Sequence, residues 1–485
     1  MRMSKNVRAI LIIGTIIKLF GIVYRMISTR LLGLEGMRLM SLITPSLSLC
    51  LCLSSFSIQT VCNQKIASNI ENKKLRVSAI LLASFKVTMI SSCIVAIAML
   101  LSFPIYKYFY QNSFIYYPLL ACIPLIFFSN TSGVMKGYLE GVNNFHTTHI
   151  SNLLESLAKI LFTVVLLYLY KRYSPEIQVL LAFASLALSE AVSLIYLAFK
   201  IKKYKKKSIR EIDTNGLEKD IFKQALPLTL EGLSTTIGGW ITPFIFYAGC
   251  KNASIDFYTS TSYYNLAQSY AIPLLFSGQF AMLTIAKFIY PSISKNQGNL
   301  PKVHSIFNKS LILGLLLSVF CFTLCYNYPK EALNILYGNS KSENIVVFLA
   351  PLYLFIYFDP IFIIILQSYK KGKALLMIST ITQILSMLLI YLLSSNPIFN
   401  TTGYIIGISI AYLIKFILLV IVALRTIKYK LTLTKNIIFI PISIIYFLLV
   451  YFIDGYLSYI FLSIAFLLLY LLLYYFLNNK KSHSH

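Results

Sequence analysis

Long apolar stretches follow one another along almost the whole chain, and they constrain the fold more than any other feature. An α-helix needs about 20 apolar residues to cross a bilayer, and inside the lipid its backbone must satisfy its own hydrogen bonds. The 485 residues are 58% hydrophobic and 12% charged, against about 25% charged residues in a soluble domain. This excludes a soluble globular enzyme, a disordered chain and a secreted disulfide scaffold, and it predicts an all-α integral membrane protein with about 14 transmembrane helices. The predicted helices are 9–29, 39–62, 78–103, 115–135, 150–170, 178–199, 224–249, 262–290, 310–328, 345–366, 374–394, 403–424, 437–453 and 456–477.

The positions of the basic residues orient these predicted helices. If the N-terminus lies in the cytoplasm, 30 of the 43 Lys and Arg residues fall in cytoplasmic segments, 8 fall in external loops and 5 lie within helices. Cytoplasmic loops of membrane proteins carry such an excess of positive residues. The sequence therefore predicts a multi-pass protein of the cytoplasmic membrane with both termini in the cytoplasm.

The formal net charge of +27 does not by itself indicate nucleic-acid binding. Most cations lie between apolar stretches, as expected for cytoplasmic loops, so we predict no nucleic-acid partner. The eight cysteines include no CxxC pair, and no spacing of His, Cys and carboxylates in the sequence predicts a metal site. The sequence has no nucleophile–base arrangement, P-loop or glycine-rich phosphate loop, so we predict neither a cofactor nor enzymatic activity.

One densely charged segment and a weak internal repeat divide the chain. Residues 200–223 hold nine Lys and Arg, and we interpret them as a basic cytoplasmic linker attracted to anionic headgroups. Three pairs of landmarks recur at a spacing of 227 or 228 residues, which indicates two copies of a six-helix unit, as in many transporters. The pairs are Pro45 and Pro273, Asn69 and Asn296, and Glu140 and Gln367. The predicted parts are an N-terminal lobe (1–199), the linker, a C-terminal lobe (224–424), and two further helices with a short tail (425–485).

Four basic residues lie inside predicted helices of the first lobe, where a charge costs about 2.5–3.5 kcal/mol. Lys18, Lys86 and Lys159 are roughly nine residues into outward-running helices, or about 14 Å deep at 1.5 Å per residue. Arg25 follows Lys18 by two turns on nearly the same helix face. One interpretation is a cationic cavity that holds a polyanion. The other is that single lysines extend their long side chains to the inner headgroups.

The embedded carboxylates also allow two interpretations. Glu155 and Lys159 have the i, i+4 spacing of an ion pair on one helix face, which serves either a substrate site or packing alone. Three further carboxylates are candidates for binding a coupling cation, and equally for ion pairs with Lys415 or with the cavity lysines. They are Glu190, Glu231 and Asp359.

Several segments resemble one transporter family. The first helix and its exit read Lys18-Leu-Phe-Gly-Ile-Val-Tyr-Arg25 and Arg30-Leu-Leu-Gly-Leu-Glu-Gly36, and Lys136-Gly-Tyr-Leu-Glu-Gly141 follows the fourth helix. Further patches are Ala225-Leu-Pro-Leu-Thr-Leu230 and Ile289-Tyr-Pro-Ser-Ile-Ser294. Together they resemble the stage V sporulation protein B branch of the polysaccharide biosynthesis (lipid-linked oligosaccharide flippase) family, within the multidrug/oligosaccharidyl-lipid/polysaccharide exporter superfamily. The resemblance covers most of the first twelve predicted helices; where the family has Gly-x-Pro late in helix 2, this chain has Ser57-Ile58-Gln59.

The resemblance implies two six-helix lobes around a central cavity that opens alternately to either side. It also implies a substrate of undecaprenyl pyrophosphate carrying a sugar or muropeptide, with membrane lipids around the polyprenyl tail. The expected role is in cell-wall or spore-cortex peptidoglycan synthesis, with cell-wall synthesis enzymes as candidate partners. The expected substrate-binding residues are Lys18, Arg25, Lys86, Glu155 and Lys159, with Arg30 at the outer mouth.

Two other functions remain open. A cation-coupled multidrug exporter of the related class would favour acidic cavity residues, because its substrates are organic cations. The first six helices contain four embedded cations (Lys18, Arg25, Lys86 and Lys159) against two anions (Glu155 and Glu190), which disfavours that function. The other alternative is a non-transporting scaffold that recruits wall-synthesis enzymes, since helix 2 departs from the pattern of the transporters.

Overall fold

Helices make up the regular secondary structure in the part of the chain that the structure describes, and no strand occurs there. This computed structural model describes residues 5–72, 77–104, 107, 116–204, 216–429, 439–452 and 455–479. The helices gather into two compact units, Met1–Phe244 and Ile245–His485, which we call unit 1 and unit 2. The division falls inside one helix, α9 (Leu217–Asn252). The predicted all-α fold is confirmed, whereas the predicted lobe boundaries stay a prediction, and residues 205–215 of the predicted linker lie outside the described residues.

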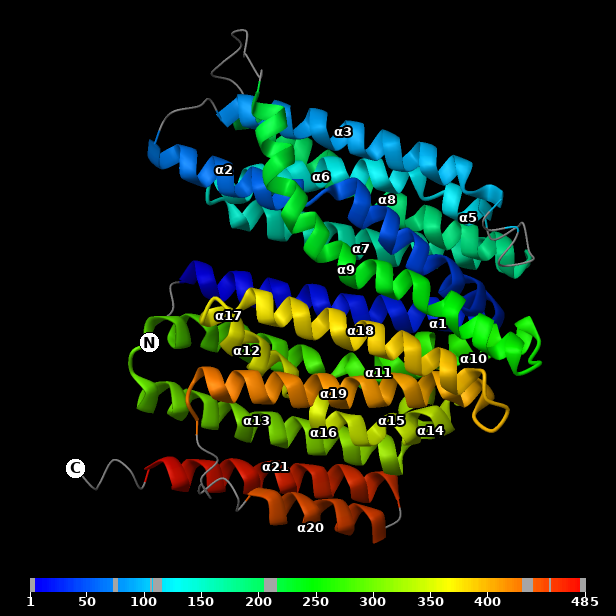
Figure 1. The fold of residues 1–485 in the computed structure, drawn as a ribbon, viewed down its shortest axis with the longest axis vertical. Coiled ribbons are helices and arrows are strands. Elements are labelled where there is room, and N and C mark those ends of the chain that lie inside the picture. The colour runs from blue at the N-terminus through cyan, green and yellow to red at the C-terminus, as the bar shows by residue number, and fades with distance from the viewer. Residues whose placement is uncertain are drawn as a thin grey trace. The chain divides into compact units, whose positions relative to one another are not determined.

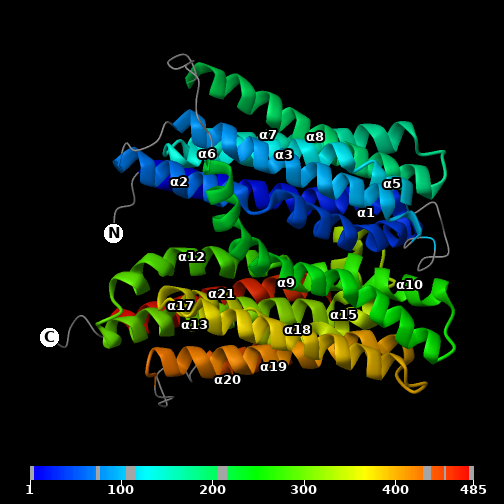
Figure 2. The ribbon, with the colours of Figure 1, turned by 45° about the horizontal axis from the view of Figure 1, so that its top comes forward.

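Unit 1 is a bundle of helices, most of them long, that lie side by side and run across the view in Figure 1. Besides the first part of α9, its helices are α1 (Lys5–Ser55), α2 (Ile58–Asn72), α3 (Val77–Leu101), α5 (Tyr116–Leu120), α6 (Ile123–Gly141), α7 (Phe145–Leu169) and α8 (Pro175–Tyr204). α7 and α8 form a hairpin, and α1 packs along both of them. α6 packs against α2, α3 and α8, so it lies in the middle of the unit (Figure 2).

Two breaks shape the first membrane-spanning stretch. At Gly33 the backbone has φ 64° and ψ −168°, a region that is essentially restricted to glycine, and α1 turns there between the predicted spans 9–29 and 39–62. A second break follows at Phe56 and Ser57, which both have positive φ. The hydroxyls of the preceding Ser54 and Ser55 donate to carbonyls three residues earlier, and such local bonds compete with the helix. The predicted span 39–62 is therefore two helical pieces, which corrects the sequence-based boundary.

A glycine face lets α2 lie directly on α6. A Cβ atom on Gly137 would lie 2.5 Å from the carbonyl oxygen of Gln59, and one on Gly141 would lie 2.7 Å from the Cβ of Ile66. This is the small-xxx-small spacing that brings membrane helices into close contact. Next to it, Asn63 on α2 donates to Glu140 on α6 over 3.3 Å. The motif 136–141 thus fixes α2 against α6.

Unit 2 is a second helical bundle with shorter, more broken helices. Its elements are α10 (Phe257–Asn265), the π-helix η2 (Leu266–Ala271), α11 (Ile272–Ser277), α12 (Gln279–Lys295), α13 (Leu300–Asn327), α14 (Pro329–Tyr337), α15 (Glu343–Leu349), η3 (Ala350–Leu352), α16 (Tyr353–Ile356), α17 (Asp359–Ser368), α18 (Gly372–Ser394), η4 (Asn400–Thr402), α19 (Gly403–Thr426), α20 (Phe439–Phe452) and α21 (Tyr456–Asn479). α20 and α21 pack on α13, where the Tyr470 hydroxyl donates to the Ile312 carbonyl over 2.6 Å.

Two of the predicted spans in unit 2 are discontinuous. The span that begins at Phe257 contains η2 and bends by 47° at Gly278. The span that begins at Glu343 is interrupted by η3 and restarts at Asp359-Pro360. The two breaks meet, because the Gln279 amide donates to the carbonyl of Ile356 over 3.0 Å. Proline and glycine explain both interruptions, since proline removes a helical hydrogen bond and glycine weakens the helix.

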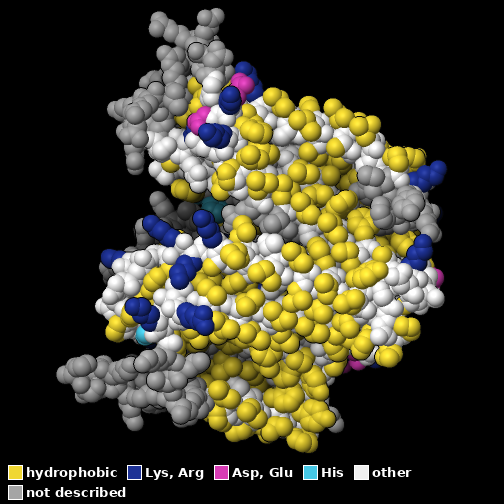
Figure 3. All heavy atoms as spheres, in the orientation of Figure 1, with side chains coloured by type: hydrophobic (Ala, Val, Ile, Leu, Met, Phe, Trp, Pro, Cys, Tyr) yellow, Lys and Arg dark blue, Asp and Glu magenta, His cyan; other side chains and the backbone are white. Residues whose placement is uncertain are grey.

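The apolar helices make the chain a multi-pass membrane protein. Within the described residues, nine helical stretches are long and apolar enough to cross a bilayer, and the bent pair would make a tenth. The first of the nine, Ile13–Ser68, includes the turn at Gly33 and so corresponds to two predicted spans. Phe439–Phe452 and Ser458–Tyr470 are shorter apolar helices where the last two spans are predicted. On the face in Figure 3, hydrophobic side chains form a band over each unit, with Lys and Arg toward its ends. The total of 14 spans stays a prediction.

Candidate substrate-binding site

Polar contacts join three helices in the interior of unit 1. The Lys136 amine on α6 lies 3.1 Å from a carboxylate oxygen of Glu155 on α7, and Lys136 is only 8% exposed. One turn earlier on α6, the Ser132 hydroxyl donates to Glu190 on α8 over 3.0 Å. Glu190 also interacts electrostatically with Lys136, Glu155 and Lys159. We call these five residues the unit 1 cluster.

The α1 helix adds positive charge beside the unit 1 cluster. The Lys159 amine lies 5.1 Å from the centre of the Tyr24 ring, within the range of a cation–π interaction. Arg25 follows Tyr24 directly, and Lys18 lies two turns earlier on α1. Because α1 packs along α7, the basic stretch of α1 runs beside the helix that carries Glu155 and Lys159.

The unit 1 cluster and the α1 stretch together carry more positive than negative charge. They contain four cations and two carboxylates, and a third carboxylate, Glu140 on α6, also interacts with Lys136, so the formal excess is one positive charge. Charges inside a membrane protein are costly unless they are paired or face a charged ligand. The excess of positive charge therefore suits an anionic ligand. The cations are Lys18, Arg25, Lys136 and Lys159, and the carboxylates are Glu155 and Glu190.

Lys136 is a member of this site that the sequence placed elsewhere. The predicted fourth helix ended at residue 135, so Lys136 counted as a cytoplasmic loop cation. In the structure α6 continues to Gly141 and buries Lys136 against Glu155. The spacing of Gly137 and Gly141 is a helix-packing signal that could have extended the helix. Lys159, at ion-pair spacing from Glu155, instead lies over Tyr24.

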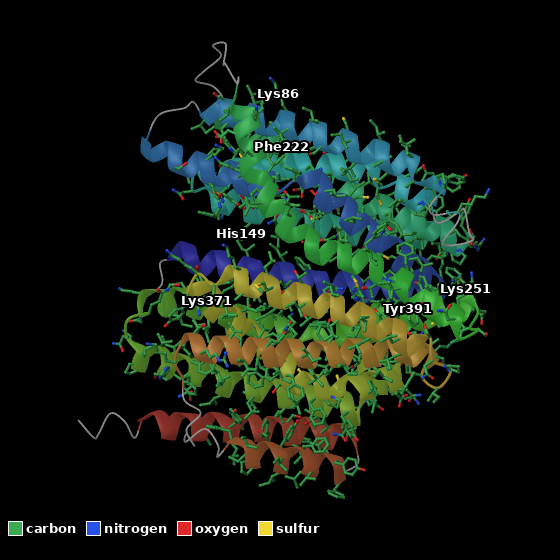
Figure 4. The ribbon with its side chains drawn as sticks, viewed as in Figure 1. Lys86, His149, Phe222, Lys251, Lys371 and Tyr391 are labelled. Carbon is green, nitrogen blue, oxygen red and sulfur yellow. The ribbon has the colours of Figure 1, made fainter. Side chains whose placement is uncertain are left out.

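Lys86 and Arg30 are not part of the unit 1 cluster. The Lys86 amine lies 2.9 Å from Glu218 in the first turn of α9, and its side chain is 59% exposed. Figure 4 shows Lys86 above Phe222, at the end of unit 1 where α9 begins. Arg30 is exposed shortly before the turn at Gly33. The roles predicted for both residues stay predictions.

The start of α9 is fastened to unit 1 by further contacts. Asp220 pairs with Lys65 on α2, and the hydrogen bond from Lys65 lowers the pKa of this carboxyl. The Phe222 ring stacks on Phe56 at a centroid distance of 4.7 Å, beside the fully buried Ile221. The first turns of α9 thus combine ion pairs at the bundle's edge with apolar burial beneath them.

The candidate cation-coupling carboxylates are spread over both units. In unit 2, Asp359 is 6% exposed and its carboxylate lies 3.6 Å from the Lys415 amine. Of the two predicted alternatives for Asp359, the structure thus contains the ion pair with Lys415. Glu190 belongs to the unit 1 cluster. The side chain of Glu231 lies outside the described residues.

The fold is that of a class of membrane transporters. The chain resembles the inward-facing structure of a multidrug resistance MATE family transporter of the MOP superfamily, with a TM-score of 0.71 and 15% identity over 85% of this chain and 94% of that one. It also resembles the MATE multidrug transporter DinF-BH, with a TM-score of 0.62 and 16% identity over 88% and 97% of the two chains. A MOP superfamily transporter from Pyrococcus furiosus, whose binding pocket of reverse polarity suggests a different function, has a TM-score of 0.57 and 15% identity over 87% and 95%. These likenesses concern the fold alone.

Sequence comparison then gives the family. The polysaccharide biosynthesis protein family matches residues 3–297, which is more than half of the chain. The chain is also 25% identical to stage V sporulation protein B of Bacillus subtilis (strain 168) over 407 residues, 81% of this chain and 78% of that protein. The chain therefore belongs to the polysaccharide biosynthesis protein family, which confirms the resemblance inferred from its motifs.

Proposed function

We propose that this protein is a flippase of the cytoplasmic membrane that moves a lipid-linked polysaccharide precursor by alternating access. The family and the transporter fold support a lipid-linked precursor as the cargo. We further propose undecaprenyl pyrophosphate with a sugar or muropeptide as the substrate, in cell-wall or spore-cortex synthesis, as the likeness to stage V sporulation protein B suggests. Both termini are proposed to lie in the cytoplasm.

The observation that carries the proposal is the excess of positive charge among the helices of unit 1, where Lys136 is buried and Lys18, Arg25 and Lys159 are partly buried. A diphosphate brings two or more negative charges into the protein, and cations in a low-dielectric setting bind it strongly. Lys159 and Arg25 lie on the facing helices α7 and α1, and we assign them the diphosphate. Lys136, held by Glu155, contributes from α6. The polyprenyl tail would stay among the lipids while the headgroup crosses.

The ion pairs of the embedded carboxylates also favour this function over drug export. Multidrug transporters share the fold, so the fold does not distinguish between the two functions. Organic cations need acidic partners, and here Glu155 is neutralised by Lys136. In unit 2, Asp359 likewise has Lys415 within 3.6 Å. A lipid with an anionic headgroup therefore fits these contacts better than a cationic drug.

Reconstituted vesicles test the proposal. The protein is placed in liposomes with a fluorescent polyprenyl-diphosphoryl sugar, and a membrane-impermeant quencher reports how fast the lipid crosses. Lys159→Ala and Arg25→Ala should slow crossing by roughly tenfold or more, since a hydrogen bond to a charged group contributes about 1.5–3 kcal/mol. The matched control is Lys171→Ala, an exposed cation between α7 and α8, with which the lipid should cross at the wild-type rate. Equal rates for all four proteins would refute the assignment, and transport of a cationic dye in place of the lipid would favour the drug exporter.

A further inference from the structure

One end of unit 2 carries a basic surface without acidic residues. Three turns meet there: α12 to α13, α17 to α18, and the end of α19. The sequence of these turns, 286–310, 366–374 and 424–429, contains no Asp or Glu. Nine exposed cations lie on these turns or on the helical residues next to them, and none forms an ion pair with a carboxylate in the described part of the chain. We call these nine residues the basic rim: Lys287, Lys295, Lys302, Lys309, Lys370, Lys371, Lys373, Arg425 and Lys428.

Hydrogen bonds hold the three turns of the basic rim together. The Gln297 amide, between α12 and α13, donates to the carbonyl of Ser368 at the end of α17. His304 at the start of α13 is hydrogen-bonded to the carbonyl of Ile427 at 2.8 Å, and its ring packs edge-on against Tyr429 with centroids 4.9 Å apart. The like charges of the basic rim are therefore held near one another by neutral contacts. Such an arrangement favours a bound anion, because the protein itself supplies no counter-charge.

Exposed apolar side chains begin one helical turn from the basic rim. Four residues after Lys373, Met377 is 60% exposed on α18, and four residues before Arg425, Ile421 is 41% exposed on α19. On α12, Phe288 is 46% exposed and follows Lys287 directly. A soluble anion would contact only the charged part of this surface. A phospholipid would contact both parts, with its phosphate at the amines and its acyl chains along the apolar faces.

We propose that the basic rim is a binding surface for acidic phospholipids, of which phosphatidylglycerol is the simplest example. In unit 1, by contrast, the protein itself supplies carboxylates for such cations, since Lys65 pairs with Asp220 and Lys86 pairs with Glu218. The basic rim has no such partners among the described residues and takes its counter-charge from the membrane. This surface lies in a different unit from the unit 1 cluster, so its lipid binding does not depend on the transport proposal.

Native mass spectrometry of the full-length protein tests this binding. The protein is delipidated in detergent and titrated with phosphatidylglycerol or phosphatidylcholine, and the bound lipids are counted. The test variant combines Lys370→Gln, Lys371→Gln and Lys373→Gln. The matched control combines Lys251→Gln, Lys330→Gln and Lys341→Gln, three exposed cations elsewhere in unit 2. Figure 4 shows Lys371 and Lys251 at opposite ends of the unit. Equal unfolding temperatures in lipid-free detergent establish that the variants are folded.

The wild type should bind phosphatidylglycerol more tightly than phosphatidylcholine, and added salt should reduce the difference. At low ionic strength, the ratio of the affinities for phosphatidylglycerol and phosphatidylcholine should fall about fivefold for each charge that the test variant lacks. The control should keep the wild-type preference. The proposal is overturned if the test variant keeps it too, if the control loses it equally, or if the wild type binds both lipids alike. It is also overturned if soluble polyphosphate binds the basic rim and phosphatidylglycerol does not displace it, because the partner would then be a soluble anion.

Discussion

The Lys136–Glu155 pair offers a quantitative test of how unit 1 holds its charges. The two side chains are 10% and 21% exposed and lie 3.1 Å apart. With an effective dielectric constant of about 20, two unit charges at this distance attract by about 5 kcal/mol. The loss of hydration on burial offsets much of this attraction. Removing one partner, however, leaves the other charge buried and unpaired, which typically costs about 3–5 kcal/mol. We therefore expect Lys136→Met to lower the free energy of unfolding by about 3 kcal/mol.

The other half of the pair should respond differently. Glu190 also attracts Lys136, so Glu155→Gln leaves the lysine with a partner and should cost less than Lys136→Met. The double variant Lys136→Met/Glu155→Gln should cost less than the sum of the two single changes by more than about 1 kcal/mol, as coupled residues do. Unfolding in mixed micelles can be followed through the protein's single tryptophan, Trp240, whose ring nitrogen donates to Ser46 in unit 1 over 3.1 Å. The reasoning would be refuted if the stability losses of the two single variants simply add in the double variant. It would also be refuted if Lys136→Met is as stable as the wild type.

Three other substitutions probe the backbone and the edge of unit 1. Gly137→Ala should lower the free energy of unfolding by about 1–3 kcal/mol, because the new Cβ would lie 2.5 Å from the Gln59 carbonyl oxygen. The control is Gly239→Ala on α9, whose Cβ would have no neighbour within 4 Å. In the same assay it should leave the free energy of unfolding unchanged or raise it. Gly33→Ala should cost about 1–3 kcal/mol because of its φ of 64° and ψ of −168°; an unchanged unfolding midpoint would mean that α1 turns by another route. Lys65 lowers the pKa of Asp220 in the folded state, so the stability from this carboxylate is complete above its ordinary pKa of about 3.9 and is lost as pH falls through the lowered value. Stability measured from pH 6 downwards should therefore decline less steeply in Asp220→Asn, and parallel curves would contradict the contact.

The large-scale features of this fold were accessible from the sequence because lipid imposes a simple rule. A spanning helix must be apolar over about 20 residues, so hydropathy alone locates most of the helices. The breaks were harder to predict because they depend on local hydrogen bonds. Ser54 and Ser55 bond backbone carbonyls just before the break at Phe56, where the sequence has neither proline nor glycine. By contrast, the breaks at Pro360 and Gly278 can be predicted from the sequence, because proline and glycine disfavour a continuous helix.

The sequence indicated some residues of the candidate site, but neither Lys136 nor the pairing of the charges. Lys159 and Arg25 were found because a charge inside an apolar helix is unusual. Which carboxylate meets which cation depends on how the helices pack, and sequence spacing pointed to Lys159 as the partner of Glu155. Close packing of α6 brings Lys136 there instead. The partner of Lys86 could not be predicted from sequence spacing either, because Glu218 lies 132 residues away in the chain.

The central claim is that cations in unit 1 recognise the diphosphate of a lipid carrier. The most direct measurement compares the affinity of the purified protein for undecaprenyl diphosphate and undecaprenyl monophosphate, in the wild type and in Lys159→Ala. We predict that the wild type prefers the diphosphate and that the variant loses most of this preference while still binding the monophosphate. Equal affinities for the two lipids in the wild type, or an unchanged preference in the variant, would contradict the claim.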